Sequence, residues 1–496
     1  MEQTQPRVPH VVLLPFPSLG HIKPMLSLAE LLSHASFQVT FLNPQQIHDR
    51  LLLSMDMPAF HRRHPEFEFL SMPDPVRPSR DRPPPGLFSL HDKILSLGSV
   101  IKPALGELLI SFNQEKGRRQ PATCIIADGL LSSPVIDVSE QFEIPFFPLR
   151  TLSACCIWAY FNLPKLVEEG DVPFQVADED MDKLVTCIPG LENVVRRRDL
   201  PGIFRIKRAN DPALESFIND QTLVLPRASG LILNTFDELE APVIAKLGSH
   251  FTKVYTVGPL HGLSTVRIND LIPLASGENI LWKEDTSCMT WLDSQLSNSV
   301  IFVSFGSVII LTRDQMFELW HGLVNCGKPF LWVIREDSVI GEDGPSLILG
   351  KLKDMTGDKG LLVSWAPQEQ VLTHPAIGGF LTHSGWNSTL ESIFAGVPMI
   401  CWPAIGDQQM NSRFVSDVWK IGFDMKDSCD RSLIEKLVRD LMEDKREEIM
   451  KSVNEIKKLA HEAVKEGGSS FCNLDKLIDD IRLRSHLAHN NSEGKK

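Results

Sequence analysis

The sequence predicts an α/β protein with parallel sheets and more than one domain, and three observations support this. Short apolar runs end in Gly, Pro, Asn or Asp, as buried strands do. Segments with apolar residues at helical spacing separate these runs, and this alternation is typical of a parallel sheet. The chain has 496 residues, which is too long for one ordinary core, so two or more domains are expected.

The composition is that of a globular enzyme. Hydrophobic residues make up 43% and charged residues 23% of the chain, and the net charge of −13 without basic clusters argues against a nucleic-acid partner. The nine Cys show no metal-binding spacing, so we expect reduced thiols, a cytoplasmic location and no metal. The polar N-terminus and the short apolar run at residues 11–16 predict neither a signal segment nor a membrane span.

The first half of the chain places two polar side chains at strand ends. Residues 11–15 read as a strand, residues 17–21 as a tight loop, and His21 therefore follows the first strand. A second buried strand at residues 123–127 ends at Asp128. The carboxyl ends of parallel strands share one edge of a sheet, where ligands bind, so we expect both residues at that edge. Residues 56–82, between these strands, read as irregular.

The second half contains the densest set of polar side chains. Residues 361–409 predict the order strand, helix, strand, helix, strand. Polar residues follow these strands or open these helices: Gln368, His383, Asn387, Ser388, Glu391, Asp407 and Gln408. Ser307 likewise follows a predicted strand at residues 300–304. A helix N-terminus attracts anions, so the turn at residues 385–388 beside His383 predicts a phosphate site.

Local signals also predict the bounds of the helix inside this stretch. Asn387 and Ser388 are favourable N-cap residues, and Glu391 has the capping-box spacing from Ser388. Gly396 is a natural residue to follow the last turn. A helix from residue 388 to residue 395 is therefore expected.

The stretch from Trp365 to Gln408 is forty-four residues long and resembles the donor-binding signature of plant UDP-dependent glycosyltransferases of family 1. The loop Pro17-Ser18-Leu19-Gly20-His21 is similar to the P-x-x-G-H loop of that family. The resemblance implies the GT-B fold, with two Rossmann-like domains whose parallel sheets face a central cleft. It implies an acceptor-binding domain at 1–260, a linker at 261–283, a UDP-sugar-binding domain at 284–465, a helix at 466–484 that crosses back, and a disordered tail at 485–496.

The same resemblance implies roles for the residues that match it. His21 would be the catalytic base and Asp128 would orient it. The UDP-sugar would be held by Ser307, Trp365, Ala366, Gln368, His383, Gly385, Trp386, Asn387, Ser388, Glu391, Asp407 and Gln408. Within that set, Trp365 would stack on uracil, Ala366 would pair with its edge, and Trp386, Asp407 and Gln408 would read the sugar. No metal or other cofactor would be required.

The implied activity is inverting transfer of glucose from UDP-glucose to a hydroxyl or carboxyl of a small lipophilic plant metabolite, by a monomer. The acceptor wall would include Phe16, Phe88, Trp158 and Phe161. The chain looks similar to iridoid and terpenoid glucosyltransferases, which implies an aglycone such as 7-deoxyloganetic acid, and flavonoid or phenolic O-glucosylation is the alternative. A non-catalytic nucleotide-sugar-binding protein is a rival class. A serine hydrolase is disfavoured, because the segment around Ser384 lacks the glycines of G-x-S-x-G.

Overall fold

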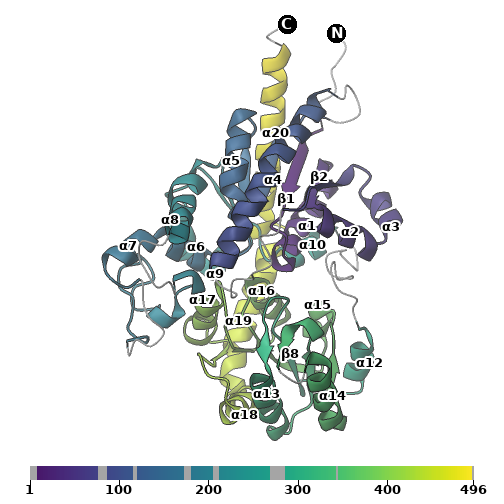
Figure 1. Cartoon of the computed structure of the whole chain (residues 1–496), viewed down its shortest axis with the longest axis vertical. Coiled ribbons are helices and arrows are strands. Elements are labelled where there is room, and N and C mark those ends of the chain that lie inside the picture. Colours follow the sequence, from purple (N-terminus) through teal and green to yellow (C-terminus); the bar gives the residue numbers. More distant parts are fainter. Residues whose placement is uncertain are drawn as a thin grey trace. The chain divides into compact units, whose positions relative to one another are not determined.

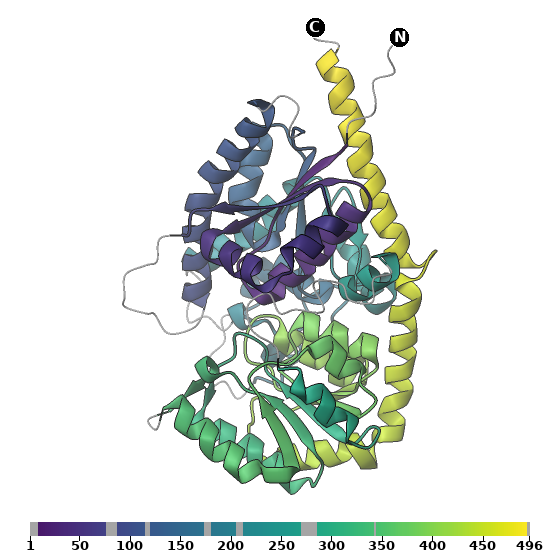
Figure 2. The same cartoon turned by 90° about the vertical axis from the view of Figure 1, so that its right-hand side faces the viewer.

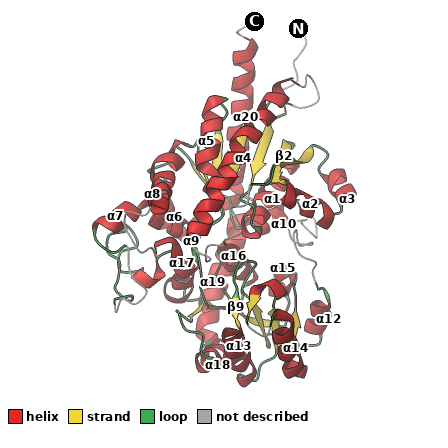
Figure 3. Cartoon of the chain, viewed as in Figure 1, coloured by secondary structure: helices red, strands yellow, loops and turns green. Residues whose placement is uncertain are grey.

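The computed structural model describes residues 8–75, 87–114, 120–172, 180–204, 212–268, 285–341 and 344–493. The chain divides into two compact units, each of which is continuous in space but not in sequence (Figure 1). The first unit comprises residues 1–173, 206–275 and 462–496, and the second comprises residues 174–205 and 276–461. Helices lie around the strands of each unit (Figure 3).

The first unit contains a parallel sheet of seven described strands, in the order β3-β2-β1-β4-β5-β6-β7. These strands are β1 (His10–Leu14), β2 (Gln38–Pro44), β3 (Phe67–Met72), β4 (Cys124–Asp128), β5 (Phe146–Arg150), β6 (Leu231–Leu233) and β7 (Val254–Thr256). In the β1–β4 ladder, Val11 pairs with Cys124 and Leu14 with Ala127, so both strands end at the same edge. The polar residues that follow them therefore share that edge.

Helices of the first unit lie between successive strands of this sheet, except α10 (Leu260–Ile268) and α20 (Ser469–Glu493), which follow β7. The others are α1 (Leu19–His34), α2 (Gln45–Ser54), α3 (Met57–Arg63), α4 (Leu87–Gln114), α5 (Ser132–Gln141), α6 (Ala154–Phe161), α7 (Leu163–Glu168), α8 (Pro212–Asn219) and α9 (Asp237–Leu247). The long α20 runs along the first unit (Figure 2), where the Asp480 carboxylate accepts a hydrogen bond from Tyr255 of β7. This contact joins the end of the chain to the edge strand.

Helix α4 supplies one apolar face to the core of this unit. Buried residues at helical spacing pack with β1, β4 and α5, namely Leu97, Ile101, Leu105, Leu109 and Phe112. By length and composition alone, residues 91–114 could also cross a membrane. The prediction of no membrane span did not take this helix into account. Packing accounts for one face of this helix, and 22% of its most apolar window is buried in the structure.

The second unit contains a parallel sheet of six described strands, in the order β12-β10-β8-β13-β14-β15. These are β8 (Val300–Ser304), β10 (Phe330–Val333), β12 (Gly360–Val363), β13 (Ile377–Thr382), β14 (Met399–Cys401) and β15 (Gly422–Asp424), and a short pair is formed by β9 (Leu311–Thr312) and β11 (Val339–Ile340). Its helices include α12 (Ser287–Asp293), α13 (Arg313–Asn325), α14 (Pro345–Thr356), α15 (Gln368–Thr373), α16 (Trp386–Ala395), α17 (Gln408–Arg413), α18 (Arg431–Arg439) and α19 (Arg446–Val464).

One part of the first sheet differs from the expectation. Residues 56–82 were predicted to be irregular, but β3 lies within them and pairs with β2. Phe67 and Phe69 point to the same side of β3, and both contact the ring of Phe60 in α3. The alternation of Phe67 and Phe69 around Glu68 was the available signal, but it is too short to stand out in a polar region.

The unit boundaries also differ from the predicted domains. Residues 174–205 belong to the second unit, although they precede the predicted linker. Part of that linker is α10, and its residues 269–283 lie outside the described part of the chain. The predicted tail from residue 485 continues α20 as far as Glu493, because no Gly or Pro interrupts the helix before that point. Residues 494–496 lie outside the described residues.

Candidate active site

The imidazole of His21 lies in the first turn of α1. The helix begins at Leu19, so His21 is helical rather than part of the predicted loop. The backbone N–H groups of His21 and Ile22 both donate to the carbonyl of Ser18, each at 2.9 Å, and this fixes the start of the helix. The ring centroids of Phe16 and His21 are 5.2 Å apart, so Phe16 covers one side of the imidazole.

His21 and Asp128 form a close pair, as the family resemblance implied, and both lie at the strand-end edge that the sequence predicted. The distance from His21 Nδ1 to Asp128 Oδ2 is 2.6 Å. The other carboxylate oxygen of Asp128 accepts a hydrogen bond from the N–H of Leu130 at 2.9 Å, and Asp128 itself is 2% exposed. Both oxygens of the carboxylate are therefore engaged, and its orientation toward the imidazole is fixed.

Thr151 is a third member of this cluster, and the sequence analysis missed it. Its Oγ1 lies 3.0 Å from His21 Nδ1. The three residues follow β1, end β4 and follow β5, and these strands are adjacent in the sheet. The signal for Thr151 was the same as for Asp128, namely a polar residue at the end of a buried strand.

This arrangement can prepare His21 to accept a proton. A buried carboxylate at Nδ1 favours the tautomer with its proton on Nδ1, which leaves the lone pair on Nε2. The His21 side chain is 19% exposed, so part of the ring can be reached from outside the protein. The cluster therefore has the form of a general base with an orienting carboxylate.

In the second unit, Gln368 joins two residues of α16. Its Nε2 donates to Ser388 Oγ at 2.9 Å and to Glu391 Oε2 at 2.6 Å. The expected capping box is wrong, because α16 starts at Trp386 with Gly385 as its N-cap. Ser388 and Glu391 therefore lie inside the helix and face α15. The predicted end is confirmed, because Gly396 has φ +78° and its N–H bonds to Ser392 and Ile393.

Two glycines lie close to the imidazole of His383. A Cβ atom on Gly306 would lie 2.7 Å from the imidazole, and one on Gly385 would lie 2.5 Å from its Nε2. Burial of the ring lowers the pKa of His383 to about 4, although part of the residue still reaches the surface. The side chain is therefore neutral at neutral pH and can act as a hydrogen-bonding group rather than as a cation.

Ser384 turns the chain from β13 into α16. It has φ +63° and is fully buried, and its carbonyl accepts a hydrogen bond from Asn411 Nδ2 at 2.9 Å. A buried hydroxyl cannot attack a substrate, which argues against the serine-hydrolase alternative. The turn aims the first N–H groups of α16 along the helix axis, where an anion such as a phosphate binds favourably.

The other predicted donor residues also follow strands of the second sheet. Ser307 follows β8, Trp365 and Ala366 follow β12, Asn387 lies in the first turn of α16, and Asp407 and Gln408 follow β14. These strands end at the same edge of the sheet. The predicted donor residues therefore follow β8, β12, β13 and β14, as the sequence predicted.

Two of these side chains are already engaged within the protein. Trp386 is 2% exposed and packs against Trp419, with ring centroids 6.3 Å apart, so its backbone is better placed than its ring to meet a ligand. Gln408 Oε1 accepts the N–H groups of Ala404 and Ile405, both at 2.9 Å. Gln408 thereby fixes the loop before α17 and leaves its Nε2 group for another partner.

The predicted acceptor wall divides into separate places. Phe16 lies beside His21, whereas Trp158 and Phe161 stack on each other at 6.3 Å and both contact His250. Trp158 is buried within this cluster, which identifies it as part of the packing around α6. Phe88 lies in α4 at a position whose side chain is outside the described residues.

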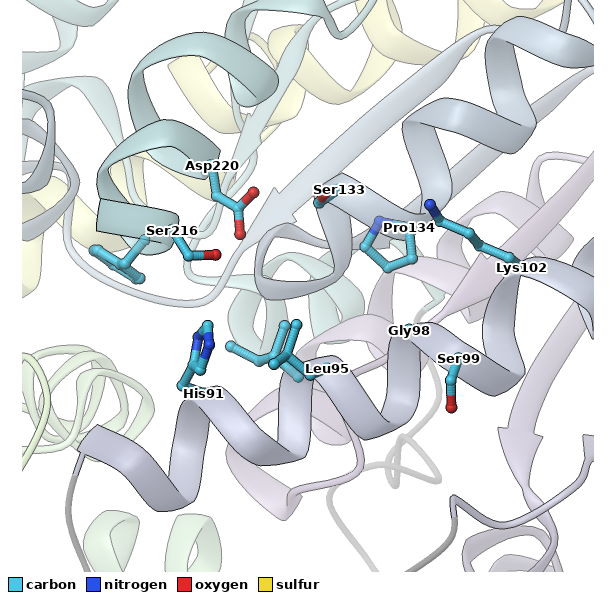
Figure 4. Close-up of a pocket in the computed structure, with 11 residues that line it drawn as sticks. His91, Leu95, Gly98, Ser99, Lys102, Ser133, Pro134, Ser216 and Asp220 are labelled. Carbon is cyan, nitrogen blue, oxygen red and sulfur yellow. The ribbon is translucent and has the colours of Figure 1, made fainter. Parts of the chain in front are cut away.

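A cavity of about 340 Å³ lies elsewhere in the first unit, between α4, α5 and α8 (Figure 4). His91 and Ser216 lie at one end with Asp220, and Leu95 and Pro134 lie between them and Lys102. Burial raises the pKa of Asp220 to about 6, against the opposing effects of His91 and a hydrogen bond from Ser133. The described residues that line this cavity do not include His21 or Asp128, so the cavity is distinct from the His21 cluster.

A metal centre is not evident in the described residues, which contain no group of three or more His, Cys, Asp or Glu side chains suited to hold an ion. Within the described residues, the His21 cluster and the strand ends of the second sheet are therefore the candidate sites for catalysis and ligand binding.

Comparison with known proteins gives the family and the fold. Residues 274–459 match the family described as UDP-glucoronosyl and UDP-glucosyl transferase. The chain is 46% identical to 7-deoxyloganetic acid glucosyltransferase of Catharanthus roseus, covering 96% of this chain and 97% of that protein. It is also 46% identical to mogroside I-A1 synthase of Siraitia grosvenorii, covering 97% of this chain and 90% of that protein. The crystal structure of Os79 from O. sativa in complex with UDP aligns with a TM-score of 0.76 at 26% identity, covering 95% of this chain and 100% of that one.

Proposed function

We infer the function from one premise: the chain belongs to the UDP-glucoronosyl and UDP-glucosyl transferase family, and it is a UDP-glycosyltransferase with the GT-B fold. Its activity is the transfer of glucose from UDP-glucose to a small metabolite. We propose residue roles in catalysis and donor binding that the geometry of each unit supports. The observation that carries them is the 2.6 Å contact between His21 and Asp128.

We propose that His21 is the general base. Its Nε2 takes the proton from an acceptor hydroxyl while that oxygen forms a bond to the anomeric carbon of glucose. The bond between that carbon and the diphosphate oxygen breaks, and UDP leaves with the electron pair. Asp128 stabilises the imidazolium that forms, because its carboxylate lies at Nδ1. A single displacement from the opposite face inverts the configuration, so the α-linked donor gives a β-glucoside.

The second unit would hold the donor. Trp365 is half-buried and offers a flat ring for uracil, and Ala366 follows it in the backbone. Gln368 and Glu391 would bind the ribose hydroxyls, since a carboxylate accepts hydrogen bonds well. Ser307, His383, Asn387, Ser388 and the N-terminus of α16 would bind the diphosphate. Because the pKa of His383 is about 4, it would donate a hydrogen bond to the leaving group without carrying a positive charge.

We propose an iridoid or other monoterpenoid aglycone such as 7-deoxyloganetic acid as the acceptor. Support comes from the relative named for glucosylating that compound, which is 46% identical over nearly the whole chain. Flavonoid and phenolic acceptors are the alternative. We further propose that the enzyme is a cytoplasmic monomer without a membrane span, and that it needs no metal, since the base and the helix N-terminus supply the chemistry.

The test uses the full chain, UDP-glucose, and a panel that contains 7-deoxyloganetic acid and a flavonol, with products read by mass spectrometry. His21→Ala should lower kcat by about 10²- to 10⁴-fold while UDP binding, measured by calorimetry, stays unchanged. Near-full transfer by His21→Ala would overturn the assignment of the base. A wild-type chain that binds UDP but transfers glucose to no member of the panel would favour a non-catalytic binding protein. Product with the flavonol alone would overturn the proposed acceptor.

A further inference from the structure

Residues 180–204 come from the first half of the chain but belong to the second unit. They leave the first unit after α7 (Leu163–Glu168) and precede α8 (Pro212–Asn219), both of which belong to the first unit. Within the second unit, the segment contacts α17 and the loop before it, which carry Asp407 and Gln408. These contacts bear on the position of the loop.

The segment is organised around a buried ion pair. The guanidinium of Arg196 donates to both oxygens of Asp199, at 2.7 and 2.8 Å, and Asp199 is 2% exposed. Burial alone would lower the pKa of Arg196, but its hydrogen bonds to Asp199 raise that pKa above its ordinary value. Burial raises the pKa of Asp199, and its hydrogen bonds with Arg196 oppose that shift, so the geometry of two parallel hydrogen bonds identifies the ion pair. Removing one charge would weaken the compensation of the other.

The same ion pair connects to the end of α17. Arg413, the last residue of that helix, donates from Nε to the carbonyl of Val194 at 2.8 Å, and the same atom lies 3.5 Å from Asp199 Oδ2. A second link runs through Asp424, which lies 3.5 Å from Arg196 and accepts a hydrogen bond from Ser412 Oγ at 2.9 Å. The segment thus holds α17 at two successive residues.

The segment also touches the loop directly before Asp407. The N–H of Gly202 donates to the carbonyl of Gly406 at 2.9 Å. A Cβ atom on Gly202 would lie 3.3 Å from the nitrogen of Gly406, which is tighter than most such contacts. The approach of the two backbones therefore favours glycine at position 202. Residues 202 and 406 fix the distance between the segment and the loop.

The position of the loop is passed on to the turn beside His383. Asn411 Nδ2 donates both to Asp407 Oδ2, at 2.8 Å, and to the carbonyl of Ser384, at 2.9 Å. A displacement of Asp407 would therefore strain the turn that precedes α16. The hydrogen bonds run without interruption from Gly202 through the loop to this turn.

We propose that residues 180–204 position the loop before α17, which would contact the donor sugar. Through this loop, Asp199, Arg413 and Gly202 set the preference for glucose. This inference rests on the proposed function and on the sugar-contacting role that the family resemblance implies for Asp407 and Gln408. These three residues are positioning residues, since they act through the loop. Glucose and galactose differ only in the orientation of one hydroxyl, so a small displacement of the loop changes which sugar fits.

The experiment compares Asp199→Asn with Asp182→Asn in the full chain. Asp182 lies on the same segment and pairs with Arg196 and Arg198 of that segment, and its side chain is 59% exposed. Asp199→Asn should raise KM for UDP-glucose about tenfold, because a hydrogen-bonded charge is lost. It should leave KM for the acceptor unchanged and lower the ratio of kcat/KM for UDP-glucose over UDP-galactose. Asp182→Asn should change none of these by more than about twofold.

Gly202→Ala provides a second variant in case Asp199→Asn does not fold, since it adds one methyl group at the loop contact. It should lower the same sugar ratio while the melting temperature falls by no more than a few degrees. If both variants match Asp182→Asn in donor KM and sugar ratio, the inference is wrong. An equal rise in both KM values would indicate general loss of structure and would also overturn it. A wild-type chain that transfers no sugar would instead refute the proposed function.

Discussion

Thr151 Oγ1 lies 3.0 Å from His21 Nδ1, the same atom that Asp128 contacts at 2.6 Å. Only one proton can occupy Nδ1, and the charged carboxylate at the shorter distance is the stronger acceptor. Thr151 therefore supports the orientation of the ring, and Asp128 supplies the charge. The two partners should consequently differ in their effect on catalysis.

Asp128→Asn should lower kcat about 10²- to 10⁴-fold, because the amide can no longer stabilise the imidazolium. Thr151→Val has nearly the same shape and should lower kcat by about threefold to tenfold through loss of one neutral hydrogen bond. Steady-state kinetics with UDP-glucose and a saturating acceptor measures both variants. Equal losses in the two variants would contradict this division of roles, and Thr151→Ser is the conservative control that should restore activity.

The strand-end argument explains why His21 and Asp128 could be placed at one edge of the sheet from the sequence. Each follows or ends a short apolar run, and the carboxyl ends of parallel strands meet at one edge. The family resemblance supplied their pairing and did not include Thr151, and the sequence alone shows neither that β4 lies next to β1 nor that β5 lies next to β4. Strand order is decided by packing across the whole unit, which no local pattern records.

Other features could not be predicted for local reasons. The start of α16 was misplaced because Ser384, a residue other than glycine, adopts a positive φ and turns the chain into the helix before Ser388. Residues 180–204 lack a regular apolar period, and their association with the second unit depends on ion pairs such as Arg198 with Asp427. The partners in such pairs lie far apart in the sequence, so charge alone does not reveal them.

Gln368 should contribute to donor binding through Glu391. Its Nε2 lies 2.6 Å from Glu391 Oε2, and Glu391 is 6% exposed. Gln368→Ala removes this donor and one of the contacts that orient the carboxylate, so we expect the Kd for UDP to rise about tenfold. Calorimetry measures it, with Gln370→Ala, an exposed position on α15, as the control. An unchanged Kd would show that the Gln368–Glu391 pair serves the packing of α15 on α16 alone.

Asp220 should make stability depend on pH in a defined direction. Burial raises its pKa from 3.8 to about 6. Between these values the folded protein keeps a proton that the unfolded chain has released, so the free energy of unfolding falls as pH rises through this range. Asp220→Asn removes the titrating group and keeps a partner for Ser133. The variant should therefore melt at a higher temperature than wild type above about pH 7 and show no such gain below about pH 4.

Melting curves at several pH values check this expectation. Asp92→Asn is the matched control, since Asp92 is an exposed carboxylate on the same helix, α4, that lines the cavity. It should shift the melting temperature equally at all pH values. A gain for Asp220→Asn that is the same at acidic and neutral pH would contradict the assigned direction of the pKa shift.

Gly306→Ala should weaken donor binding more than Gly202→Ala or Gly350→Ala. Gly306 has φ +70°, which costs an alanine about 1–2 kcal/mol, and its added Cβ would lie 2.7 Å from the imidazole of His383. Gly385 also lies close to this ring, since a Cβ there would be 2.5 Å from Nε2. The ring must therefore tilt out of the position from which it would meet the diphosphate.

We expect Gly306→Ala to lower the melting temperature by several degrees, about what 1–2 kcal/mol gives in a chain of this size, and to raise the Kd for UDP about tenfold or more. Gly350→Ala is the control, because a Cβ there has no heavy atom within 4 Å. UDP binding by calorimetry separates the two effects, since a purely structural loss would reduce stability and leave the affinity of the folded fraction unchanged. That second result would show that His383 does not contact the diphosphate.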